Sequence, residues 1–155
     1  ERMSDVPKAA LETNDSNKFE CRPTLLRVEE NSNCVFTRNY EKGEVVLFPS
    51  AHAEGKFVLS DNEDLKRLKK NNQIIFRYIT PDGEEPVYPW NPNGSIDHIA
   101  GITNPEGNVL GLMPHPERVF YPYTTPDWTR KGLENDKKNG KPLFNSAIEY
   151  VETNF

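Results

Sequence analysis

Two prolines on either side of a histidine restrict the backbone more than any other stretch of this 155-residue chain. The mostly apolar segment 109–113 is typical of a buried strand, and Pro114-His115-Pro116-Glu117 follows it directly. Each proline fixes its own φ and biases the residue before it towards extended geometry. We therefore predict a strand that ends in a stiff, extended turn carrying His115 and Glu117.

His115 and Glu117 are two positions apart, so in extended backbone their side chains project to the same side. A carboxylate that binds one ring nitrogen of a histidine leaves the other nitrogen able to act as a base towards a nucleophile. The same spacing also suits a surface histidine or a satisfied core histidine, so spacing alone leaves catalysis open. A metal site is less favoured, because His52 and His98 lie in separate segments and no His-x-x-His or Cys-x-x-Cys spacing occurs.

Several motifs of the chain resemble one known family. They are Asn91-Pro92-Asn93-Gly94-Ser95, Asp97-His98-Ile99-Ala100-Gly101-Ile102, the run 107–118 that contains the histidine–glutamate pair, and upstream segments such as 18–22, 40–44 and 51–57. Together they resemble the glutaminase subunit of phosphoribosylformylglycinamidine synthase, within the class I glutamine amidotransferase family. The combination of the Asn-Pro-Asn-Gly-Ser loop with His-Pro-Glu argues against a class I amidotransferase that serves a different acceptor.

The resemblance implies an α/β fold, the C-terminal part of a flavodoxin-like class I glutamine amidotransferase domain with a mixed sheet and flanking helices. We expect residues 18–155 to form this C-terminal part of a single domain. Residues 1–17 are polar and show no clear period, so we expect an irregular lead-in there. Local patterns predict strands over 45–49 and 73–79, a helix over 63–70 capped by Asp61 or Asn62, a hairpin of 96–103 with 108–113, and a helix over 143–151.

The resemblance also implies the chemistry of a Cys–His–Glu glutaminase. A cysteine thiolate attacks the side-chain amide of glutamine, ammonia leaves, and water then releases glutamate from the thioester. His115 would act as general base and acid, Glu117 would orient it, and no metal or cofactor is implied in this chain. The ammonia would pass to a synthetase subunit that holds ATP and Mg and converts formylglycinamide ribonucleotide to the amidine. A small accessory subunit is a further expected partner.

The chain departs from the family's pattern at the nucleophile. The family places its cysteine in a Gly-x-Cys-x-Gly elbow, whose glycines permit a strained turn and close approach of substrate. Neither Cys21 nor Cys34 has flanking glycines, and Cys21 matches a family position that is not the nucleophile. We therefore expect the nucleophile in an N-terminal remainder of the domain, and no glutamine hydrolysis by this chain alone. The alternative is a non-catalytic docking module of this family that binds the synthetase partner.

Three further residues are candidates for the mouth of the site. In the family, the loop around His52 reads Ala-His-Gly-Glu-Gly, and Ala53 replaces its central glycine here. The resemblance implies that His52, Glu54 and Asn93 lie near substrate or near the synthetase. For His52, a structural role that caps the loop is equally compatible with the sequence, and His98 is expected to be structural.

Composition argues against several other functions. A net charge of -5 provides no basic footprint for nucleic acid. No apolar run reaches about 18 residues, so no membrane span is predicted, and the N-terminus has no signal-peptide pattern. Two cysteines without an evident partner favour a reducing, cytoplasmic location. Hydrophobic content of 35% with 13 prolines is low for an independent core, which suits a domain that packs against neighbours.

Overall fold

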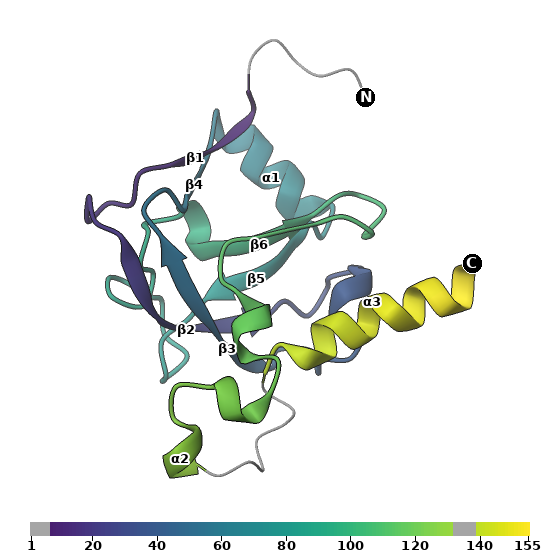
Figure 1. The fold of residues 1–155 in the computed structure, drawn as a ribbon. Helices are drawn as coiled ribbons and strands as arrows, with labels where there is room; N and C mark the ends of the chain where they lie inside the picture. Colours follow the sequence, from purple (N-terminus) through teal and green to yellow (C-terminus); the bar gives the residue numbers. More distant parts are fainter. Residues whose placement is uncertain (1–6, 132–138) are drawn as a thin grey trace.

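The structure is a computed structural model that describes residues 7–131 and 139–155. A five-stranded sheet in the order β3-β2-β5-β6-β7 forms its centre, and β1 and β4 form a separate two-stranded ribbon (Figure 1). The strands are β1 (Ala9–Glu12), β2 (Glu20–Val28), β3 (Val45–His52), β4 (Lys56–Leu59), β5 (Ile74–Tyr78), β6 (Ile99–Thr103) and β7 (Leu110–Leu112). The helices are α1 (Asn62–Lys70), α2 (Trp128–Lys131) and α3 (Lys141–Asn154), with short 3-10 helices η1 (Val35–Thr37), η2 (Ile96–His98), η3 (Pro116–Val119) and η4 (Pro122–Thr124).

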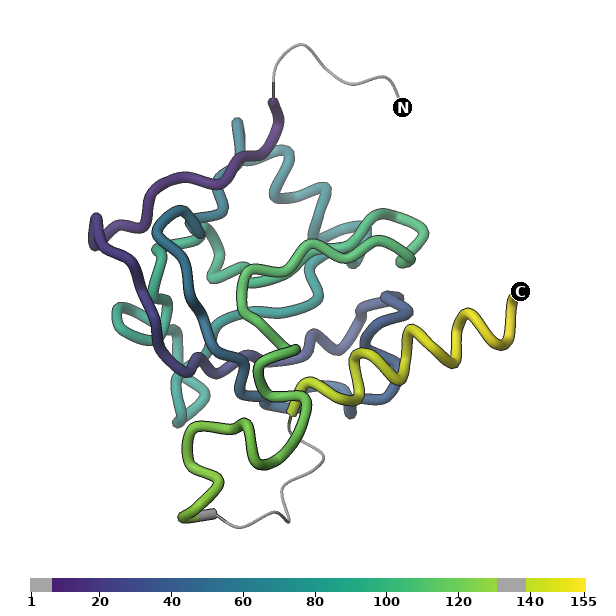
Figure 2. Tube along the Cα trace, in the orientation of Figure 1, coloured from purple at the N-terminus to yellow at the C-terminus, as the bar shows by residue number. Residues whose placement is uncertain are grey.

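Every strand pair within the described residues is antiparallel, and the sheet is curled. The chain beyond β7 returns to β3, where the backbone N–H of His115 donates to the carbonyl oxygen of Pro49 at 2.7 Å (Figure 2). The expected combination of a sheet with helices is present. The parallel strands of a mixed, flavodoxin-like sheet are not found among the described residues. Parallel pairing requires a long crossover, whereas β6 and β7 are joined by a short hairpin loop.

Most elements predicted from local patterns are confirmed. The strand predicted over 45–49 continues to His52 as β3, the strand over 73–79 is β5, and the predicted hairpin is β6–β7. The helices predicted over 63–70 and 143–151 are α1 and α3. Asp61 caps α1, because its carboxylate accepts a hydrogen bond from the backbone N–H of Asp64 at 2.8 Å.

The expectation of an irregular lead-in over 1–17 is wrong for one stretch. Ala9–Glu12 forms β1, which pairs with β4 in the register Ala9↔Leu59 to Glu12↔Lys56. Residues 1–6 lie outside the described residues. Local pattern did not reveal β1, because its sequence does not alternate and all of its residues are exposed. A distant strand, rather than a neighbouring one, supplies its hydrogen-bonding partner.

The core lies inside the curl of the sheet, and η3 and α3 pack against the sheet through this core. Phe48 and Phe76 are both fully buried and make an edge-to-face contact with ring centroids 5.7 Å apart. Val119 of η3 and Leu143 of α3 belong to the same cluster of buried side chains. The segment that carries His115 and Glu117 is therefore anchored to the core at its far end.

We expect Phe48→Ala to lower the free energy of unfolding by about 3–5 kcal/mol, because the substitution leaves a cavity beside Phe76. Urea unfolding followed by circular dichroism measures this change. Val87→Ala is the matched control, since Val87 is 73% exposed and its loss should stay within about 0.5 kcal/mol. Equal effects of the two substitutions would contradict the placement of the core.

Candidate active site

His115 and Glu117 are in contact just beyond β7, with Nδ1 of His115 2.7 Å from Oε1 of Glu117. His115 has extended backbone (φ −103°, ψ 93°), as predicted. Glu117 lies in the first turn of η3, although the sequence suggested that both residues would be extended. The difference has a local cause: Pro116 occupies the start of the helix, where its fixed φ is compatible and its missing N–H leaves no hydrogen bond unmade.

The contact determines which nitrogen of His115 is basic. A carboxylate accepts a hydrogen bond, so Nδ1 carries the proton and Nε2 has the lone pair. The side chains of His115 and Glu117 are 33% and 55% exposed, so a substrate or another polypeptide segment can reach the pair. Such a pair can take a proton from a nucleophile and return it to a leaving group.

Gly140 allows α3 to approach the turn that carries this pair. Its N–H donates to the carbonyl oxygen of Val119 at 3.0 Å. A Cβ at position 140 would overlap the carbonyl oxygen of Pro116, so glycine is required for this close contact. Sequence reasoning missed Gly140, because the two segments meet only in the tertiary structure.

His52 is buried at the end of β3, and one of its two ring nitrogens has a hydrogen-bond partner. Its Nδ1 lies 3.2 Å from Oδ1 of Asn14. The Asn14 amide has a defined orientation, since its Nδ2 donates to the carbonyl oxygens of Lys18 and His52. Oδ1 must therefore accept from Nδ1–H of His52. The remaining nitrogen, Nε2, is buried and has no hydrogen-bond partner among the described residues.

Burial lowers the pKa of His52, and the electrostatic influence of His115 lowers it further, while Glu20 acts in the opposite direction. The hydrogen bond to Asn14 fits a structural role in which His52 supports the loop, and its expected place near substrate or the synthetase stays a prediction. Glu54 is exposed in the turn between β3 and β4. Ala53 does not adopt a positive φ, so replacing the family's glycine creates no strain there.

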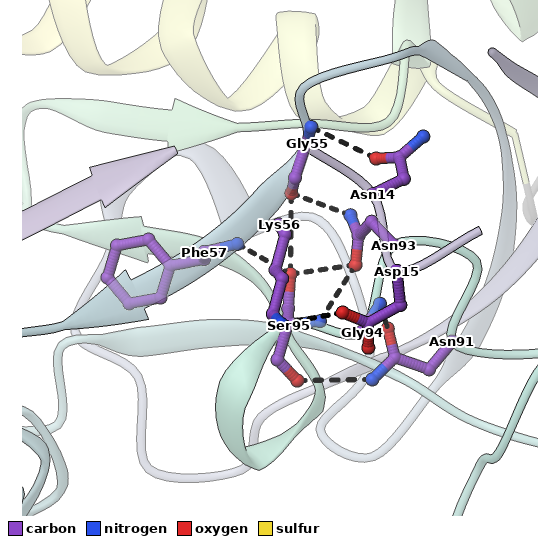
Figure 3. A network of polar contacts seen from close by, with 9 residues as sticks. All are labelled: Asn14, Asp15, Gly55, Lys56, Phe57, Asn91, Asn93, Gly94 and Ser95. Carbon is purple, nitrogen blue, oxygen red and sulfur yellow. Dashed lines mark hydrogen bonds and ion pairs between the residues drawn. The ribbon is translucent and has the colours of Figure 1, made fainter. Parts of the chain in front are cut away.

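Asn93 is fully buried and connects three loops (Figure 3). Its Nδ2 donates to the carbonyl oxygen of Gly55 at 2.7 Å and to the Tyr78 hydroxyl at 3.0 Å. Its Oδ1 accepts from the backbone N–H of Ser95 at 3.0 Å and from the Ser95 hydroxyl at 2.8 Å. All donors and acceptors of its side chain are occupied, so the amide links the loops structurally, and its expected place near substrate or the synthetase stays a prediction.

The turn between β1 and β2 joins the same network (Figure 3). The backbone N–H of Asp15 donates to the carbonyl oxygen of Asn93 at 3.2 Å, and the Asp15 carboxylate binds Lys56 at 2.6 Å. Gly94 has φ +80°, and a Cβ there would overlap the Asp15 carboxylate. Asn14 and Asp15 were not among the predicted residues, since their roles depend on loops far along the chain.

The two cysteines lie in different surroundings. Cys34 is buried in the core, and burial raises the pKa of its thiol, which disfavours the thiolate. Cys21 is exposed on β2, opposite Ala51 of β3. Within residues 7–131 and 139–155, no group of three or more His, Cys, Asp or Glu side chains is arranged to hold a metal ion. No helix in that part of the chain is long and apolar enough to cross a membrane.

The chain is similar to curated proteins named phosphoribosylformylglycinamidine synthase subunit PurQ. The protein from Archaeoglobus fulgidus is 46% identical over 153 residues, which cover 97% of this chain and 54% of the relative. The protein from Methanosarcina mazei is 43% identical over 148 residues, covering 96% of this chain and 58% of the relative. The chain therefore spans little more than half the length of these relatives.

A solved structure and a family match agree with this similarity. The structure of PurLQS from Thermotoga maritima contains a chain that is 34% identical, with a TM-score of 0.64 over 95% of this chain and 55% of that chain. Residues 1–151 match the family described as the CobB/CobQ-like glutamine amidotransferase domain. Because that match extends over nearly all of its residues, the chain belongs to the CobB/CobQ-like glutamine amidotransferase family.

Proposed function

We propose that this chain carries the histidine–glutamate part of a glutaminase. The ammonia it helps release from glutamine would serve the conversion of formylglycinamide ribonucleotide to formylglycinamidine ribonucleotide in purine biosynthesis. The observation that carries this proposal is the 2.7 Å contact between Nδ1 of His115 and Oε1 of Glu117. Its position in a glutamine amidotransferase domain and the PurQ names of the relatives support the choice of substrate.

In the proposed mechanism, Nε2 of His115 takes the proton from a cysteine thiol. The resulting thiolate attacks the carboxamide carbon of glutamine, and His115 returns the proton to the nitrogen that leaves as ammonia. Water, deprotonated by the same Nε2, then attacks the thioester and releases glutamate. Glu117 keeps the proton on Nδ1 and stabilises the imidazolium that forms in each half of the reaction.

The nucleophile belongs, in this proposal, to a segment other than the two cysteines of this chain. Cys34 is buried with a raised pKa, so its thiolate is disfavoured. Cys21 lies within the strand β2, whereas a nucleophile elbow is a sharp turn between a strand and a helix. The glutaminase is then complete only when the remainder of the domain is present.

A neutral His52 favours this chemistry. A positive charge on His52 would oppose the imidazolium that His115 must form, because the two rings interact electrostatically. Burial of His52 disfavours its charged form. We therefore assign the proton-accepting role to His115, which contacts Glu117, rather than to His52.

The proposed partners follow from the relatives. The Thermotoga structure is of PurLQS, so we propose that this chain also works beside a synthetase subunit and a small accessory subunit. ATP and Mg would bind to the synthetase, and this chain would hold neither. Such a complex would act in the cytoplasm, in agreement with two cysteines that have no disulfide.

A chimera tests the catalytic proposal. It joins the part of the Archaeoglobus relative that lies outside the match to the N-terminus of this chain, and glutamate release from glutamine is measured. We expect activity that His115→Ala lowers about 10²- to 10⁴-fold, the range of general acid–base catalysis. Glu117→Gln should lower kcat with little change in KM, because it acts through His115.

Cys21→Ser and Cys34→Ser are the controls in the same chimera and should retain nearly full activity. Loss of activity in either variant, with cooperative unfolding preserved, would overturn the assignment of these thiols. A folded chimera that binds the synthetase but releases no glutamate would favour the docking module instead.

His52 makes stability depend on pH in a defined direction. Its folded pKa is lowered, so its contribution is complete above the unfolded value of about 6.5 and is lost as the pH falls towards the folded value. We expect the free energy of unfolding of the wild-type chain to fall between about pH 7.5 and 5.5, by at most about 1.4 kcal/mol per pH unit from this group. His52→Gln should fall less over the same interval in urea unfolding. Parallel curves for the two proteins would show that His52 titrates normally.

A further inference from the structure

His52 and His98 differ in how their ring nitrogens are occupied. Both nitrogens of His98 have partners, since Nδ1 lies 3.1 Å from Nδ2 of Asn91 and Nε2 lies 3.0 Å from Oε1 of Glu85. His52 is only 7% exposed, yet its Nε2 is buried without a hydrogen-bond partner among the described residues. A buried polar atom without a partner is costly, so we expect this nitrogen to meet a donor from outside those residues.

Asn14 determines which nitrogen of His52 carries the proton. Oδ1 of Asn14 accepts from the backbone N–H of Gly55 at 3.1 Å (Figure 3) and lies 3.2 Å from Nδ1 of His52. Nδ2 of the same amide donates to the carbonyl oxygens of Lys18 and His52, which fixes its orientation. Nδ1 of His52 is therefore protonated, and Nε2 has the lone pair of an acceptor.

The His52 ring also has a defined position. A Cβ at position 55 would overlap the ring, at 2.3 Å from Nδ1, so Gly55 is required for the ring to lie there. Asn14 on the other side is 1% exposed. Nε2 is thus an acceptor with a fixed direction, as recognition of one N–H group requires.

Arg22 provides a complementary donor on the neighbouring strand. It pairs with Ser50 in the strand register, two residues from His52, so the two side chains are diagonal neighbours with Cβ atoms about 7–8 Å apart. Nε of Arg22 is buried and likewise lacks a hydrogen-bond partner in the part of the chain that the structure describes. Its Nη2 is engaged by the carboxylate of Glu20 and by the Tyr88 hydroxyl. The vacant donor of this side chain is therefore Nε–H.

A neutral acceptor beside a cationic donor suits the free end of an α-amino acid. The ammonium group can donate to Nε2 of His52, and the carboxylate can accept from Nε of Arg22. Burial lowers the pKa of His52, so the ring stays neutral and does not repel an ammonium group.

The strand that carries His52 also holds the backbone of His115. The N–H of His115 donates to the carbonyl oxygen of Pro49, and His52 follows three residues later in β3. Three residues of an extended strand span about 10 Å. An amino acid bound at His52 by its α-ammonium is therefore of suitable length to extend its side chain towards His115.

We propose that His52 and Arg22 bind the α-ammonium and α-carboxylate of glutamine, and that Asn14 is a positioning residue that keeps Nε2 of His52 as an acceptor. The identity of the amino acid rests on the proposed function. The two groups give selectivity for free glutamine, because an analogue that lacks either charge leaves a buried polar atom unpaired.

Nitrogen NMR of the histidine rings tests the role of Asn14 in the 155-residue chain. We expect His52 to show one tautomer, protonated on Nδ1, and Asn14→Leu to populate the tautomer protonated on Nε2. Asn14→Asp keeps an acceptor for Nδ1 and should retain the wild-type tautomer. His98 is the internal reference. A wild-type His52 protonated on Nε2 would overturn the role of Asn14, whether or not Asn14→Leu folds.

Substrate analogues test the binding roles in the chimera described above. Ammonia release is compared for glutamine, for glutaramate, which lacks the α-ammonium, and for glutaminamide, which lacks the α-carboxylate. We expect glutamine to be preferred over each analogue by about 10- to 100-fold in kcat/KM, the range for a hydrogen bond to a charged group. His52→Leu should lose only the preference over glutaramate, and Arg22→Lys only the preference over glutaminamide. His52→Gln keeps an acceptor and should retain part of the first preference, and His98→Gln should change neither.

Calorimetric binding of the same three compounds makes the result independent of hydrolysis. Binding with these selectivities but without ammonia release would contradict only the proposed function. An active chimera in which His52→Leu and Arg22→Lys keep the wild-type selectivities would overturn only the binding roles. A folded chimera that binds no glutamine would contradict both.

Discussion

The curl of the antiparallel sheet is the constraint on which the candidate site depends. It brings the chain that leaves β7 back to β3, where His115 donates its backbone N–H to Pro49. Val119, a few residues further on, is fully buried in the core. The backbone around His115 is thus fixed by the hydrogen bond to Pro49 on one side and by the buried Val119 on the other. The short helix η3 lies between these two points and brings Glu117 to the His115 side chain.

A second constraint is the need to satisfy buried polar groups. Three loops meet at Asn93, whose donors and acceptors are all occupied, and the Asn14 amide performs a similar role beside His52. An unmade hydrogen bond at such a buried site costs about 1–3 kcal/mol. The polar network therefore specifies one arrangement of the loops around β3.

Local patterns predicted much of this architecture because they report interactions between nearby residues. The cap at Asp61, the hairpin β6–β7 and the helical spacing of α3 all depend on a few consecutive positions. The strand β1 was missed because its partner is distant, and the described residues contain only the antiparallel pairings of the mixed sheet that the resemblance implies. The complete burial of Asn93 was not predicted, because only the surrounding loops create it.

By itself the sequence determined the stiff Pro-His-Pro-Glu turn, the spacing of its two functional groups and the absence of glycine-flanked cysteines. Proline geometry and residue spacing are properties of the covalent chain, so they need no tertiary information. The tertiary structure alone decided that Gly140 must be small and that His52 is buried with its Nε2 unpartnered among the described residues. These features arise where segments far apart in sequence come into contact, and steric fit and burial act only after the sheet has curled.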